Sequence, residues 1–127
     1  MPLARVRLAR AQLALERGER ATARERLGRV DDTVTELGAT YWQGRCRQLR
    51  GEIAAADDDH ALARKQFRAA LERFETAGAP DDVLATLELL VDRCRADGDT
   101  AAAQELLDRA REALADAPDA VADEHRE

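Results

Sequence analysis

The sequence predicts an all-α fold, a right-handed α-α superhelix of three antiparallel helical hairpins with six helices. Apolar residues recur at spacings of three and four, which places them on one face of a helix. The same pattern returns every forty residues, an internal period that is typical of helical solenoids. Apolar residues make up 45% of the chain but aromatic residues only 3%, so Leu, Ala and Val must build most of the core.

The first hairpin is expected to hold one helix from Pro2 to about Arg17 and a second that ends near Leu37, with Gly18 in the turn between them. Two neighbouring apolar rows lie on the first helix, Leu8, Ala11 and Leu15 in one and Val6, Ala9 and Leu13 in the other. The inner face of the second helix is predicted to consist of Ala23, Leu27, Val30 and Val34.

The second hairpin begins with a helix over about 40–56, which the hydroxyl of Thr40 can cap. Its predicted buried row is Trp42, Cys46, Leu49 and Ile53, and Gly51 offers a point of close approach. The segment 58–78 follows, and its helical pattern recurs forty residues earlier and forty residues later. Its predicted apolar face is Ala61, Ala63, Phe67, Ala70, Leu71 and Phe74. Aspartates at 57–59 suit the positive end of that helix's dipole.

The third hairpin starts at Pro80, a residue that suits the first turn of a helix. The predicted buried row of the fifth helix is Val83, Leu87, Leu90, Val91 and Cys94. After a turn at Gly98, the sixth helix repeats the inner face with Ala103, Leu107, Ala110 and Leu114. Pro118 is expected to end this helix, ahead of a polar tail over 118–127.

Residues forty positions apart share chemical character. The equivalent sets are Gly18, Asp58 and Gly98; Ala23, Ala63 and Ala103; Leu27, Phe67 and Leu107; Val30, Ala70 and Ala110; and Gly38, Gly78 and Pro118. The repeats are therefore placed at about 2–38, 39–78 and 79–117, within one domain over 1–117.

These positions resemble the tetratricopeptide (TPR) repeat. The pattern Gly-x-x-x-x-Ala-x-x-x-Leu/Phe-x-x-Ala/Val is similar to the second helix of that repeat, and residues 63–78, ARKQFRAALERFETAG, are similar to its long-helix, forty-residue variety. That variety is known from kinesin light chain-like scaffolds and from large signal-responsive bacterial transcription regulators. The family's first-helix signature is poorly kept: Trp42 and the run Leu49-Arg50-Gly51 echo it only in displaced positions.

The resemblance implies that the first helices line a concave face that binds a peptide or a partner helix. Carried over by position, that face comprises Arg5, Gln12, Arg45, Gln48, Glu52, Glu88, Asp92 and Arg95. It runs from basic to acidic, which would select an extended ligand of opposite gradient. The alternative is that these are ordinary exposed polar residues. The carboxylate clamp of TPR chaperone cofactors uses asparagine, which this chain lacks, so that specific activity is not expected.

The net charge of −6 is unevenly distributed. Residues 1–50 hold eleven arginines against six acidic residues, whereas residues 51–127 hold nine basic against twenty acidic residues. The basic half also carries acidic side chains around its helices, so nucleic acid is not an expected partner. No stretch approaches the length of a membrane span, and the N-terminus lacks a signal peptide's apolar core. We therefore expect a cytoplasmic protein with no membrane partner.

The sequence predicts no enzyme, no metal site and no cofactor. It contains no serine and no phosphate-binding loop. The run Asp57-Asp58-Asp59-His60 lacks the ligand spacing of a calcium loop and is expected to be a solvated turn that caps a helix. Cys46 and Cys94 have no zinc-like spacing and are expected to be free, buried thiols.

The function that the sequence favours is a protein–protein interaction module that binds a peptide or partner helix through a concave groove. One alternative stays open, a ligand-sensing or self-associating regulatory domain of a larger signalling or transcription-regulator protein. Homodimerisation through an end helix stays open as well, because the ends of a three-hairpin stack leave apolar faces uncovered.

Overall fold

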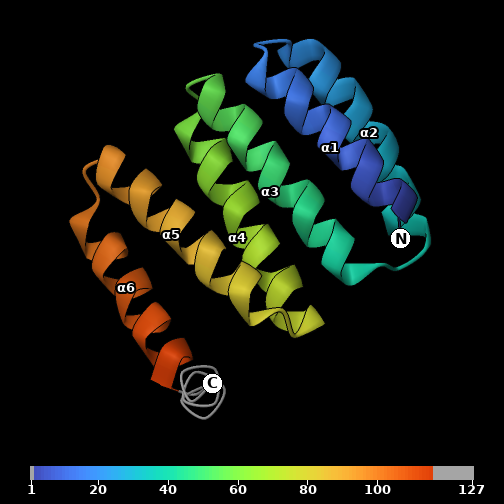
Figure 1. The fold of residues 1–127 in the computed structure, drawn as a ribbon. Coiled ribbons are helices and arrows are strands. Elements are labelled where there is room, and N and C mark those ends of the chain that lie inside the picture. The colour runs from blue at the N-terminus through green and yellow to red at the C-terminus, as the bar shows by residue number, and fades with distance from the viewer. Residues whose placement is uncertain (1, 116–127) are drawn as a thin grey trace, which may run out of the picture.

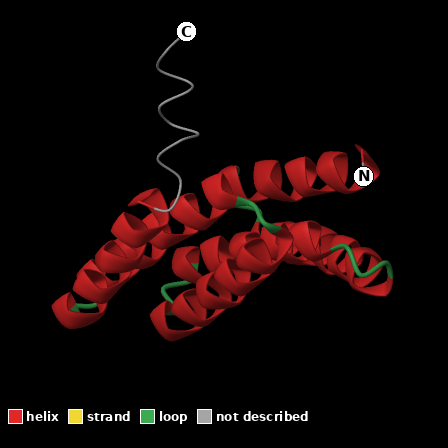
Figure 2. Cartoon of the chain, turned by 90° about the horizontal axis from the view of Figure 1, so that it is seen from below, coloured by secondary structure: helices red, strands yellow, loops and turns green. Residues whose placement is uncertain are grey.

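The computed structural model describes residues 2–115, which form six α-helices joined by turns of two or three residues (Figures 1 and 2). The helices are α1 (Pro2–Glu16), α2 (Arg20–Glu36), α3 (Thr40–Ala56), α4 (His60–Ala77), α5 (Pro80–Ala96) and α6 (Thr100–Ala115). No strand occurs within these residues. The predicted all-α class is therefore confirmed for residues 2–115. None of these helices is both long and apolar enough to cross a lipid bilayer.

Each helix packs against the next one along the chain, and α1 also contacts α3. We refer to α1–α2, α3–α4 and α5–α6 as hairpins 1, 2 and 3. The contact between α3 and α4 is the most extensive in the molecule. Figure 1 shows hairpin 2 in the middle of the row, with hairpin 1 on one side and hairpin 3 on the other. One core cluster joins α1, α2 and α3, and a second joins α4, α5 and α6 with Ala54 of α3.

The helix boundaries repeat at the spacing expected from the sequence. The second helix of each hairpin begins at Arg20, His60 and Thr100, forty residues apart. Each of the five turns contains one residue with positive φ, between 60° at Asp58 and 77° at Gly18. Aspartate tolerates this left-handed conformation better than most side chains, which explains how Asp58 can stand where the other turns have glycine.

Hairpin 2 is held together by two aromatic rings that lie over two glycines. A Cβ atom added at Gly51 would lie 2.5 Å from Cε1 of Phe67, and one added at Gly44 would lie 2.7 Å from Cε1 of Phe74. Both phenylalanines are fully buried. The close approach predicted at Gly51 is thus confirmed, and Gly44, which the sequence pattern did not single out, provides a second one.

The residues predicted to be buried on α2, α3, α4 and α5 are buried in the structure with three exceptions. All four residues predicted for α2 are buried, and all those predicted for α4 are buried except Ala61. On α5 the prediction holds except that Val83 is half-buried, and on α3 it holds except that Trp42 is half-buried.

Other predictions are wrong. Of the two apolar rows predicted on α1, the row Val6, Ala9 and Leu13 is exposed, and Leu15 of the other row is half-buried. The buried face of this helix is Ala4, Leu8, Ala11 and Ala14. On α6, Leu106 is buried instead of Leu107, while Leu114 is 52% exposed. The pattern of apolar residues identifies the candidates for burial, but burial also needs a neighbouring helix, and hairpins 1 and 3 each have a neighbouring hairpin on one side only.

Thr40 does not cap α3. It is the first residue of that helix, and the N-cap residue is Ala39, which makes no side-chain hydrogen bond. Pro118 and the tail over 118–127 lie outside the described residues.

Ion pairs join successive hairpins at equivalent positions. Arg20 and Arg24 of α2 pair with Asp57 in the turn of hairpin 2. Forty residues later, the Arg64 Nη1 atom lies 3.6 Å and the His60 Nδ1 atom 3.9 Å from the carboxylate of Asp97. Half-exposed pairs of this kind contribute roughly 0–1 kcal/mol each, so they affect the register of the hairpins more than their stability.

Candidate partner-binding grooves

A groove of about 420 Å³ lies between α1 and α3. It is lined by Arg5, Leu8, Ala9, Gln12, Glu16, Arg45, Gln48, Leu49 and Glu52. The lining residues of each helix recur at spacings of three and four, because such residues share one helix face. Leu8 and Leu49 are buried and form the apolar floor, while the polar side chains stand along the two walls. Five of the eight residues predicted from the sequence are brought together here.

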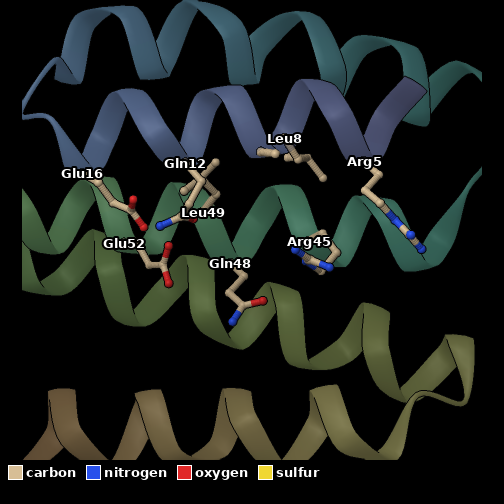
Figure 3. A pocket seen from close by; sticks show the side chains of 9 residues that line it. Arg5, Leu8, Gln12, Glu16, Arg45, Gln48, Leu49 and Glu52 are labelled. Atoms are coloured by element: carbon tan, nitrogen blue, oxygen red, sulfur yellow. The ribbon is translucent and has the colours of Figure 1, made fainter. Parts of the chain in front are cut away.

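The charges in this groove are separated along its length (Figure 3). Arg5 and Arg45 lie at one end, Glu16 and Glu52 lie at the other, and the two glutamines stand between them. The basic-to-acidic gradient that the sequence suggested along the whole chain is therefore present within a single groove. The helix rise of 1.5 Å per residue puts about 10 Å between the levels of Arg45 and Glu52.

Glu52 is a half-buried carboxylate within this groove. Burial raises the pKa of Glu52 above its ordinary value, and the nearby charge of Glu16 raises it further. A hydrogen bond with the side chain of Gln12 and the charge of Arg45 partly offset this shift in pKa. The negative charge of Glu52 is thus poorly solvated, and a bound cationic group would stabilise it.

Two aromatic residues hold Arg45 in place. The guanidinium carbon of Arg45 lies 5.9 Å from the centre of the Trp42 ring, a distance suited to a cation–π contact. Its Nη1 atom donates a hydrogen bond of 3.4 Å to the Tyr41 hydroxyl, which in turn donates one of 3.4 Å to Oδ1 of Asp82 on α5. Tyr41 also packs edge-on against Trp42 at 5.3 Å between ring centres. The Tyr41–Trp42 pair therefore supports Arg45 at the basic end of the groove.

A second groove of about 420 Å³ lies between α5 and α6. The remaining predicted residues, Glu88, Asp92 and Arg95, are exposed on its α5 wall, above a floor that includes Leu87 and Val91. Its charged side chains carry a net charge of −1, so this groove suits a basic ligand more than an acidic one.

The eight predicted residues thus lie in two separate grooves and do not form one continuous face. The reason is the position of α4, which packs against both α3 and α5, so that α3 and α5 make at most marginal direct contact. Figure 3 shows α4 between the ribbons of α3 and α5. The sequence prediction also missed Glu16. Its spacing of four from Gln12 would have placed it on the same face of the helix.

The aspartates of the 57–59 turn have structural roles, and the two cysteines are buried in the core. Asp57 pairs with arginines of α2, and Oδ1 of Asp59 accepts a hydrogen bond of 3.2 Å from the backbone N–H of Leu62, which caps α4. Cys46 and Cys94 are both free and buried, as predicted. Burial raises the pKa of the Cys46 thiol to about 12, so this thiol is protonated at neutral pH. Within residues 2–115, no cluster of three or more His, Cys, Asp or Glu side chains could hold a metal ion.

No protein-family model, curated protein or solved structure matches this chain. Function is therefore inferred from its side chains and their arrangement.

Proposed function

We propose that this chain is a TPR-like protein-interaction module, a right-handed α-α solenoid that binds a short extended peptide in the α1–α3 groove. The bound segment carries an acidic group at the Arg5–Arg45 end and a basic group at the Glu16–Glu52 end. The observation that carries this proposal is the separation of charge along a single groove with an apolar floor. The forty-residue recurrence of helices and turns supports the TPR-like architecture.

The dimensions of the groove define the ligand further. An extended peptide advances about 3.3 Å per residue, so about 10 Å corresponds to three residues. An acidic residue and an arginine three positions apart therefore reach both ends of the groove. Gln12 and Gln48 stand between the charged ends and offer amide groups to the peptide backbone.

Isothermal titration of short, blocked peptides tests the proposal. Peptides with one aspartate and one arginine three positions apart should bind, whereas peptides with two aspartates or two arginines should bind at least about tenfold more weakly. Arg45→Glu or Glu52→Arg should each reduce the affinity for the bipolar peptide by about tenfold or more, because each places a like charge against the ligand.

Two variants serve as controls for the location of the site. Lys65→Glu changes the charge of an exposed residue on α4 outside both grooves, and Glu88→Arg changes the second groove. Both should leave the affinity for the bipolar peptide within about twofold of the original value. An equal loss of affinity in all four variants would show a general charge effect and would refute a specific site between α1 and α3.

The raised pKa of Glu52 adds a pH signature. Because this carboxylate is protonated at a higher pH than an ordinary glutamate, the affinity for the bipolar peptide should begin to fall at a pH where other carboxylates are still charged. Glu52→Gln should remove this early fall.

A ligand-sensing role is the second candidate, because about 420 Å³ also lies within the size range of small-molecule pockets. A small zwitterion with its charges about 10 Å apart would satisfy the same two ends. If such a zwitterion binds as tightly as the blocked peptide, the sensing role is favoured, because the peptide backbone then contributes nothing.

The proposed module performs no covalent chemistry. His60 lies beside Arg93 and Asp97 in the contact between hairpins 2 and 3, and the Cys46 thiol is held in its protonated form. Neither residue lines the α1–α3 groove.

A further inference from the structure

Exposed apolar side chains lie on the outer face of α1, away from the core. We define this face as Leu3, Val6, Ala9, Arg10 and Leu13. All five side chains are exposed, with Val6 at 48% and Leu13 at 43%. The face is distinct from the α1–α3 groove except for Ala9 at its edge.

The equivalent face of α3 is buried against another hairpin. Forty residues after the outer face of α1 come Gln43, Cys46, Leu49, Arg50 and Ile53. Cys46 is completely buried and Ile53 is 4% exposed, because they join the core formed with hairpin 1. The corresponding residues of α5 include Thr86, which is also completely buried.

The contact of α3 with α2 shows which chemistry a helix would need to cover the outer face of α1. Nε and Nη2 of Arg50 donate hydrogen bonds of 3.1 and 2.8 Å to Oδ2 of Asp31 on α2. Asp31 is flanked on that helix by the buried Leu27, Val30 and Val34. A helix that covers α1 in the same way would present apolar residues at this spacing and a carboxylate opposite Arg10, the equivalent of Arg50.

Charge complementarity favours an acidic helix for this position. The exposed basic residues on and beside the outer face are Arg7, Arg10 and Arg17, and within residues 2–115 none of them takes part in an ion pair. A second copy of this chain suits the face less well. Its α6 would be the equivalent of α2, but the residue of α6 that corresponds to Asp31 is Arg111, which would oppose Arg10 with a like charge.

We infer that the outer face of α1 binds an acidic amphipathic helix of another protein, in the way that α3 receives α2. This inference is independent of the peptide groove, because the two surfaces share only Ala9 at their common edge.

The probe for this inference is a helix-stabilised peptide that copies residues 20–36 with Arg20→Glu and Arg24→Glu, since α2 has the required apolar pattern and these two changes give the peptide more acidic than basic residues. Fluorescence anisotropy should detect its binding to the full chain. Val6→Asp should weaken binding at least about tenfold, whereas Leu62→Asp, an exposed leucine on α4, should leave it unchanged. Circular dichroism checks that each variant keeps its helices.

A charge exchange gives the decisive result. Arg10→Glu should weaken binding about three- to tenfold, and a peptide with Asp31→Arg should restore it to the Arg10→Glu chain. Binding that survives Val6→Asp would overturn the inference, because the peptide would then be replacing α2 against α3. No binding at millimolar peptide would overturn it as well.

Two further results would point to other occupants and would also overturn the inference. Concentration-dependent self-association in sedimentation that is lost in both Val6→Asp and Leu114→Asp would identify a second copy. Binding to vesicles with 30% anionic lipid that is lost in Val6→Asp, with no binding of the α2 peptide, would identify a membrane surface.

Discussion

Equivalent repeat positions of hairpins 2 and 3 differ in how deeply their side chains are buried. In α4, Phe67, Ala70 and Phe74 are buried, whereas the equivalent residues of α6 are progressively uncovered, from the half-buried Leu107 and Ala110 to the exposed Leu114. Hairpin 2 has a neighbour on each side, and hairpin 3 has one on a single side. Burial at a repeat position is therefore a property of the stack and not of the hairpin alone.

The largest effect is expected from truncating the centre of hairpin 2. Phe67→Ala should lower the free energy of unfolding by about 3–5 kcal/mol, because it removes a fully buried ring and leaves a cavity. The equivalent change Leu107→Ala in hairpin 3 should cost only about 1–2 kcal/mol, since that side chain is half-buried. Urea denaturation measures both. Equal losses in the two variants would contradict the difference between the hairpins.

The glycine contacts of hairpin 2 give the next largest effect. Gly51→Ala should destabilise the protein by about 1–3 kcal/mol, because the new Cβ would lie 2.5 Å from the ring of Phe67. The matched control is Gly28→Ala on α2, where no atom lies within 4 Å of the added Cβ. That change should stabilise the protein by about 0.5–1 kcal/mol through helix propensity.

Thermal or urea unfolding distinguishes the two glycine variants by the sign of the change. Adding Phe67→Leu to Gly51→Ala should recover part of the loss, since the double variant has the alanine–leucine pair that hairpin 1 has at Ala11 and Leu27. Strictly additive losses would show that the ring and the glycine are not coupled.

A smaller effect, an increase in the free energy of unfolding, is expected from a change at the start of α2. The N-cap residues of α4 and α6, Asp59 and Asp99, accept hydrogen bonds from the backbone N–H groups of Leu62 and Ala102, whereas the equivalent Glu19 makes none. Glu19→Asp should supply the missing cap and raise the free energy of unfolding by roughly 0.5–1 kcal/mol. An unchanged midpoint in thermal unfolding would show that the turn before α2 cannot adopt the capping geometry.

The smallest effect concerns the dependence of hairpin 3 on pH. The pKa of Asp99 is held below its usual value by the N–H of Ala102 and by the hydrogen bond from Arg64. This stabilisation is present above the unfolded pKa of about 3.9 and is lost as the pH falls through the lower folded value. Asp99→Asn keeps a capping group without the charge, so the melting temperature of the variant should fall less than that of the original chain below about pH 4.

The sequence was sufficient for the helices, the turns and the faces that lie between hairpins. Leu27 and Val30 on α2 could be predicted as buried because their spacing marks one helix face and a further hairpin follows. Val6 and Leu13 have the same spacing, and their exposure could not be predicted, because periodicity does not reveal whether a neighbour is present. Trp42 belongs to a buried row by position, but its ring reaches the surface beneath Arg45.

The sequence identified five residues that line the α1–α3 groove, but it missed Glu16 and did not predict the division of the eight residues into two grooves. Five residues of α1 and α3 lie together because these helices contact each other directly. The close packing of α4 on α3, with Phe67 and Phe74 over Gly51 and Gly44, is a three-dimensional fit that repeat alignment does not contain.

The ion pairs between hairpins have a consequence for how such a chain can grow. The segment 40–79 carries both halves of the pairing, with Asp57 facing the preceding hairpin and His60 with Arg64 facing the following one. A tandem duplication of these forty residues would place a matching donor and acceptor at every new junction and would keep the turn positions in phase. Whole modules added in this way would keep these ion pairs at each new junction.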